Sequence, residues 1–63
     1  MNWSLSYNGN LRVWESQAYS INEVLADNDE KQYRVFHYGK ELCAPRWTIE
    51  NAKEVCEIYE GKQ

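Results

Sequence analysis

The sequence predicts an α+β fold, a four- or five-stranded antiparallel sheet with one C-terminal helix packed on one face, in a single domain over residues 1–63. Two observations lead to this prediction. Segment 48–60 has the start signal, apolar stripe and stop signal of one amphipathic helix. The segments before it are short, alternating and rich in aromatic residues, as strands are. The helix needs an apolar surface to cover, and a sheet of such strands provides one.

The first predicted element is a hairpin whose two alternating segments flank the turn Asn8-Gly9-Asn10. A two-residue Asn8–Gly9 loop would place Leu5 opposite Arg12, so the apolar faces of the two strands would not match. A three-residue loop places Leu5 opposite Val13 instead. We therefore expect the three-residue loop, with Asn10 in the left-handed conformation.

This register points Arg12 and Trp14 away from the apolar face of the sheet. Tryptophan and arginine are enriched among the residues that dominate interface energies, and an exposed tryptophan is typical of a binding surface. Arg12 and Trp14 are therefore the first candidates for contact with a partner.

Residues 18–26 fit two alternatives. Tyr19, Ile21 and Leu25 alternate as in a strand, but the segment Ser20–Glu23 also has the form of a helical capping box. A helix of barely two turns would need tertiary support, whereas a strand obtains support directly by pairing with its neighbour. We favour the strand.

Residues 33–38 give the strongest strand signal, because they are dense in β-branched and aromatic residues and end at Gly39. A short fifth strand is expected over 41–43. Pro45 then ends pairing, since proline has no N–H to donate.

The C-terminal helix is expected to begin after Thr48, a residue suited to the N-cap, and to end with Gly61 as its C-cap. Its apolar residues fall within an arc of about 120°, the width typical of a helix on a sheet, and Ile58 lies outside this arc. The stripe consists of Ile49, Ala52, Val55, Cys56 and Tyr59.

The composition limits the classes of function. A net charge of −3 disfavours a protein held to nucleic acid or anionic membranes by its overall charge. The chain has neither an apolar stretch near the roughly 18 residues of a membrane-spanning helix nor a signal peptide, so we expect a cytoplasmic protein. Two cysteines are too few for a disulfide framework, and we expect free thiols.

No catalytic residue, cofactor or metal is expected. His37 is the single histidine, and no local spacing supplies it with a nucleophile or carboxylate. His37, Cys43 and Cys56 offer three metal ligands, but without the closely spaced pair that structural zinc sites use. The chain also contains nine aromatic residues, more than one small sheet–helix interface can easily bury. We therefore expect a non-enzymatic binding protein with aromatic side chains left at its surface.

A nucleic-acid-binding surface is one alternative. If Tyr33, Val35 and His37 face the helix, the opposite face collects five basic and aromatic side chains, which could bind phosphates and stack on bases. They are Arg12, Trp14, Arg34, Phe36 and Tyr38. The simpler interpretation is that Phe36 and Tyr38 are core residues. A sheet with one terminal helix also resembles the DNA-binding domains of plant ethylene-response factors and the arm-binding domains of phage integrases, which are basic, whereas this chain is acidic.

Acidic mimicry of DNA is a second alternative. Carboxylates occur in two groups, a turn with Asp27, Asp29 and Glu30 and a helix surface with Glu50, Glu54 and Glu57, with Glu60 near its edge. Along the helix they provide one charge per roughly 4 to 5 Å, sparser than the one per about 1.7 Å of duplex DNA. An ordinary solvated helix face is the simpler interpretation.

The segments 33–39 and 48–57 resemble a pattern common in small phage and prophage proteins, in which a hairpin precedes a helix of the form Thr/Ser-Leu-Glu-Glu-Ala-Lys. Thr48 matches the cap, and Glu50, Ala52 and Lys53 match helix positions. The resemblance covers about the last half of the chain and supplies no functional residue. It implies a compact protein that blocks a host machine, such as a restriction or CRISPR complex.

The sequence therefore predicts a small inhibitor that occludes a surface of a host protein or protein complex. Eight residues are the expected contacts: Arg12, Trp14, Asp27, Asp29, Glu30, Arg34, Glu50 and Glu54. A homodimer through an edge strand or the surplus aromatic residues is a further expectation.

Overall fold

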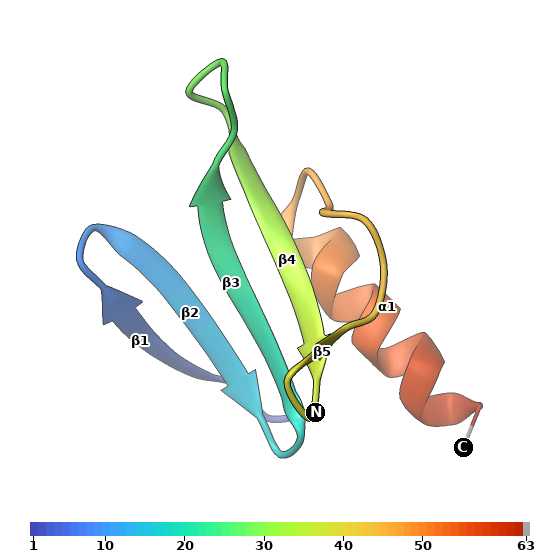
Figure 1. The fold of residues 1–63 in the computed structure, drawn as a ribbon. Coiled ribbons are helices and arrows are strands. Elements are labelled where there is room, and N and C mark those ends of the chain that lie inside the picture. The colour runs from blue at the N-terminus through green and yellow to red at the C-terminus, as the bar shows by residue number, and fades with distance from the viewer. Residues whose placement is uncertain (63) are drawn as a thin grey trace.

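The computed structural model describes residues 1–62, which form a five-stranded antiparallel sheet with one helix packed on one face (Figure 1). The strands lie in the sheet in chain order. They are β1 (Ser4–Asn8), β2 (Leu11–Ser16), β3 (Tyr19–Leu25), β4 (Lys31–His37) and β5 (Lys40–Glu41), followed by helix α1 (Ile49–Gly61). This architecture confirms the predicted α+β class and the choice of a strand for residues 19–25.

The first hairpin has a two-residue loop, Gly9–Asn10, so the expected three-residue loop is wrong. Gly9 has a φ of 66°, and Asn10 is not in the left-handed region, which is the φ pattern of a type II′ turn with glycine first. This loop pairs Leu5 with Trp14 instead of Val13. Because side chains alternate along a strand, this register puts Arg12 and Trp14 on the same face as Leu5 and Tyr7. The pairing of Trp14 with the buried Ile21 makes it the face that packs against the helix.

The core lies between α1 and the helix side of β2, β3 and β4. Trp14, Ile21 and Val35 are neighbours across these three strands, and Trp14 is only 6% exposed, so the expectation that it points outward is wrong. Tyr33 and Val35 also face the helix, which settles the face of this strand that the sequence left open. The buried apolar residues are Trp14, Tyr19, Ile21, Tyr33, Val35, Ala52 and Cys56.

The chain after β4 departs from the expected fifth strand over 41–43. Tyr38 and Gly39, with φ of 50° and 80°, turn the chain into the two-residue strand β5. Segment 42–46 then follows the edge of β4, where the Arg46 N–H donates to the carbonyl of Tyr33 at 2.9 Å. This segment brings Arg46 beside the helix.

Helix α1 begins as expected. The Thr48 hydroxyl accepts a hydrogen bond from the Asn51 N–H at 3.1 Å, which satisfies one of the free donors of the first turn. Ala52 and Cys56 are fully buried, and Ile58 is exposed, as the periodicity predicts. The helix therefore uses the predicted stripe to cover β3 and β4.

The end of α1 differs from the expectation. Gly61 is the last helical residue, and Lys62 is the C-cap with a φ of −93°, so the predicted glycine C-cap is wrong. Over residues 1–62, no helix has both the length and the apolar character needed to cross a membrane.

Candidate functional site

The structure distributes the expected contact residues over separate surfaces. Arg12 and Trp14 lie on the helix side of β2, where the Arg12 guanidinium stacks 4.9 Å from the centre of the Trp14 ring. The other six are exposed: Asp27, Asp29 and Glu30 in the β3–β4 turn, Arg34 on the outer face of β4, and Glu50 and Glu54 on α1. The contact residues therefore do not form one continuous site.

The basic aromatic platform expected on the outer face is not assembled. Arg12 and Trp14 lie on the helix side, and Tyr38 is in the turn after β4, so Arg34 and Phe36 remain. Arg34 is 5.3 Å from the Phe36 ring, and its guanidinium donates to both oxygens of Glu41 at 2.9 and 3.0 Å. Glu41 therefore neutralises the outer-face arginine that would bind a phosphate.

A buried ionic cluster at Glu23 was not predicted from the sequence. The Glu23 side chain is 0% exposed, and its carboxylate accepts hydrogen bonds from Nη2 of Arg12 at 2.9 Å and from the Tyr33 hydroxyl at 3.2 Å. The Arg12 backbone N–H also donates to it, at 3.0 Å, just past the point where the β2–β3 ladder ends. Nζ of Lys31 lies 3.7 Å away. The Glu23 cluster thus joins β2, β3 and β4 on the helix side.

The hydrogen bonds determine the charge of this cluster. Burial raises the pKa of Glu23, but the hydrogen bonds from Arg12 and Tyr33 outweigh it, and the pKa lies below its ordinary value. Burial, followed by the hydrogen bond to Glu23, raises the pKa of Tyr33. Glu23 is therefore ionised at neutral pH and inaccessible to a substrate, so the cluster holds strands together rather than catalysing a reaction.

The sequence does contain a signal for this cluster. Glu23 continues the alternation of Tyr19 and Ile21, so it falls on the apolar face of β3. A carboxylate on a buried face needs a cationic partner, because an unpaired buried charge is strongly destabilising. Arg12 meets this need because the β2–β3 register, which pairs Val13 with Asn22, places Arg12 beside Glu23.

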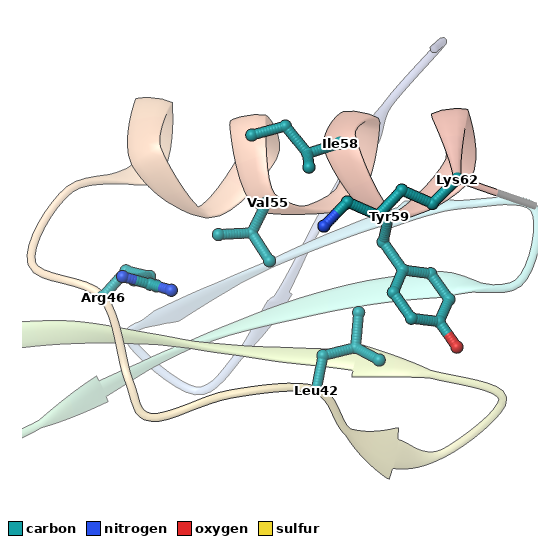
Figure 2. A pocket seen from close by; sticks show the side chains of 6 residues that line it. All are labelled: Leu42, Arg46, Val55, Ile58, Tyr59 and Lys62. Carbon is teal, nitrogen blue, oxygen red and sulfur yellow. The ribbon is translucent and has the colours of Figure 1, made fainter.

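A groove runs between α1 and segment 42–46 (Figure 2). Its cavity has a volume of about 230 Å³. Figure 2 shows Val55 and Ile58 projecting from the helix, Leu42 on the opposite wall, and Arg46 and Tyr59 toward the two ends. The groove residues are Leu42, Arg46, Val55, Ile58, Tyr59 and Lys62. The groove is thus mainly apolar, with two cationic side chains at its margin.

Arg46 stands out within the groove. Its Nε is buried and has no hydrogen-bond acceptor among residues 1–62. Unlike Arg12 and Arg34, Arg46 forms no ion pair within this described part of the chain. A buried donor without a partner is costly, so the Nε of Arg46 lowers the stability of this part of the fold.

The surface retains a large share of the apolar side chains. The expected aromatic surplus is confirmed, because four of the nine aromatic residues are exposed: Tyr7, Tyr38, Trp47 and Tyr59. Met1, Leu5, Leu25 and Ile58 are the exposed aliphatic side chains of large size. Ile58 and Tyr59 belong to the groove, and Leu5 and Tyr7 lie together on β1.

The candidate metal ligands have other surroundings. His37 packs between aromatic rings, with its centroid 4.5 Å from that of Tyr19 and 5.0 Å from that of Tyr59. Cys43 and Cys56 are free thiols, and burial raises the pKa of Cys56 to about 11, so it is protonated at neutral pH. Within residues 1–62, no three His, Cys, Asp or Glu residues are grouped closely enough to hold a metal ion.

Comparison with protein-family models, with curated proteins and with solved structures finds no match to this chain.

Proposed function

We propose that this chain is a non-enzymatic binding protein of the phage type, which inhibits a host protein or defence complex by covering part of its surface. The groove between α1 and segment 42–46 is the docking site in this proposal. The observation that carries it is an exposed apolar groove with Arg46 at its margin, on a chain whose other arginines are ion-paired.

The size of the groove favours a protein partner over a small-molecule substrate. Pockets for drug-sized ligands measure about 300 to 1,000 Å³ and enclose most of the ligand. The cavity here, about 230 Å³, is smaller. It suits one apolar side chain of a partner, the kind of anchor that dominates interface energies.

The charges at the groove indicate the chemistry of the partner segment. Arg46 and Lys62 flank apolar walls, so the complementary segment presents an apolar side chain next to a carboxylate. Such a carboxylate would pair with the Arg46 guanidinium, which forms no ion pair within residues 1–62. Docking there would leave the partner surface covered by the body of this domain.

The alternatives have less support. Nucleic-acid binding depended on a basic outer face, but Arg34 is paired with Glu41, and Glu15 lies in the same cross-strand row as Glu41. Mimicry of DNA requires closely spaced carboxylates on one surface. Those of the β3–β4 turn and of α1 belong to separate elements.

Affinity capture distinguishes a protein partner from nucleic acid. The purified protein, immobilised through a tag, is incubated with a bacterial lysate with and without nuclease treatment, and bound material is identified by mass spectrometry. We expect a bound protein that is retained after nuclease treatment. Loss of all bound protein on nuclease treatment, together with a salt-sensitive mobility shift of free DNA or RNA, would support the nucleic-acid alternative instead.

A further inference from the structure

The two edges of the sheet differ in their protection. At one edge, β5 has only two residues, and segment 42–46, which includes Pro45, bonds to β4 beyond it. At the other edge, β1 pairs with β2 through five consecutive residue pairs and has no neighbour on its outer side among residues 1–62. β1 contains no charged residue, no proline and no bulge, the devices that normally prevent edge strands from pairing with another chain.

The turn determines which backbone groups of β1 are free. The Gly9–Asn10 loop makes Asn8 and Leu11 the hydrogen-bonded pair that closes the hairpin. Along an antiparallel pair, hydrogen-bonded and non-hydrogen-bonded residue pairs alternate. Ser6, two residues before Asn8, therefore also directs its N–H and C=O groups to β2. The N–H and C=O groups of Leu5 and Tyr7 therefore point away from the sheet, along its open edge.

We propose that β1 pairs with β1 of a second copy of this chain, antiparallel and about a two-fold axis at Ser6. In this register Leu5 lies opposite Tyr7 of the second copy, and each donates its N–H to the carbonyl of the other. The two-fold axis generates a second, equivalent pair of Leu5 and Tyr7. The outward N–H and C=O groups of both residues are therefore hydrogen-bonded in both copies. This inference concerns self-association and does not depend on the proposed host partner.

The side chains of β1 favour this register. Leu5 is 49% exposed and Tyr7 is 65% exposed, both on the helix side, and the pairing places an aliphatic side chain against an aromatic ring twice. A one-residue slip would bring Ser6 opposite Leu5, although the backbone groups of Ser6 are already bonded to β2. An axis at Leu5 or Tyr7 would extend pairing beyond the five residues of β1. The axis at Ser6 is thus the one that uses the whole strand.

The pairing of the two β1 strands determines how the sheets and helices are arranged in the dimer. A two-fold axis perpendicular to the sheet makes one continuous ten-stranded sheet from two five-stranded ones and keeps both helices on the same side. The groove lies at α1, which packs on β3 and β4, away from β1 (Figure 1). Each copy in the dimer therefore keeps its groove open.

A cross-linking experiment tests the register. Because Ser6 of the two copies forms a non-hydrogen-bonded pair, their Cα atoms are about 4.5 Å apart, within the range of about 4.4 to 6.8 Å for disulfides. Ser6→Cys, in a Cys43→Ser background, is expected to form a covalent dimer under mild oxidation. The matched control is Ser4→Cys on the same exposed strand, whose two copies are about 13 Å apart along the strand direction. It should remain uncross-linked.

Sedimentation equilibrium of the unmodified protein completes the test. We expect a mass of twice 7.5 kDa at high protein concentration. Tyr7→Lys should shift the equilibrium to monomer, because it places a charge at the edge, whereas Leu25→Lys on the interior strand β3 should not. A monomer throughout the micromolar to millimolar range, or equal cross-linking of the Ser4→Cys and Ser6→Cys variants, would overturn the proposal.

Discussion

Replacing Trp14 by alanine is expected to unfold a large fraction of the protein. Trp14 is 6% exposed and packs against the Tyr33 ring at 5.8 Å between centroids. Truncating a core aromatic residue to alanine costs about 3 to 5 kcal/mol. A domain of 63 residues has a total stability of roughly 3 to 9 kcal/mol, at about 0.05 to 0.15 kcal/mol per residue. Urea denaturation followed by circular dichroism measures the loss.

Trp47→Ala is the matched control for this measurement. Trp47 is 58% exposed, so the same substitution should cost less than about 1 kcal/mol. Equal losses for the Trp14 and Trp47 variants would contradict the register in which Trp14 faces the helix. The comparison thus separates a core tryptophan from a surface one with the same chemical change.

Replacing Glu23 by glutamine is expected to give the second large effect, a loss of about 2 to 4 kcal/mol of folding stability. The amide keeps the shape of the side chain but removes the charge that Arg12 and the Tyr33 hydroxyl bind. Arg12 remains partly exposed and regains some hydration, which places the loss below that of a fully buried pair. Urea denaturation at neutral pH measures it.

The pH dependence of stability tests the same cluster independently. The folded state holds the pKa of Glu23 below its ordinary value, so the folded protein keeps this carboxylate ionised at a pH where the unfolded chain binds a proton. The contribution of Glu23 to folding stability is present above its pKa in the unfolded chain, about 4.3. It is lost as the pH falls through its lower pKa in the folded protein. The stability of the Glu23→Gln variant should therefore fall less steeply with acid than that of the unmodified protein.

Glu15→Gln provides the control for this titration. Glu15 is an exposed residue of the outer face, and it forms no ion pair within residues 1–62. Its replacement should leave the stability at neutral pH unchanged. If the stability of the Glu23→Gln variant falls as steeply with decreasing pH as that of the unmodified protein, Glu23 is not the source of the pH dependence.

The sequence was sufficient to predict elements whose signals are local. Thr48 and the apolar stripe defined α1, and the alternation at Tyr19 and Ile21 defined β3. The helix signals lie a few positions apart, whereas the local pattern of β3 also fitted a short helix, and the expected pairing with the next strand decided for the strand. The acidic turn is also local, because Asp29 adopts a positive φ of 63°, which aspartate tolerates.

The register of the first hairpin could not be obtained from the same local pattern. Val13 and Trp14 are both apolar, so either could face the core, and a shift of one residue in the strand register decides between them. The β2–β3 register pairs Trp14 with Ile21 in the core and places Arg12 beside Glu23, which is eleven residues away in sequence. This ionic pair across strands is long-range information, and it reversed the interpretation of Arg12 and Trp14 as outward contacts.

The groove likewise depends on tertiary structure. Arg46 reaches α1 because its backbone pairs with Tyr33, and this bridge lies outside the named strands. Ile58 falls outside the predicted stripe, and the sequence alone gives it no partner. Only the path of segment 42–46 creates a wall opposite Ile58 and Val55 (Figure 2).

The most direct test of the docking proposal is to measure capture and stability together for Ile58→Glu, with Leu25→Glu as control. Both side chains are slightly more than half exposed, at 53% and 57%, so each substitution should change folding stability by less than about 1 kcal/mol. We predict that Ile58→Glu abolishes nuclease-resistant capture of the host protein while Leu25→Glu retains it. Undiminished capture by a folded Ile58→Glu variant would contradict the groove as the docking site.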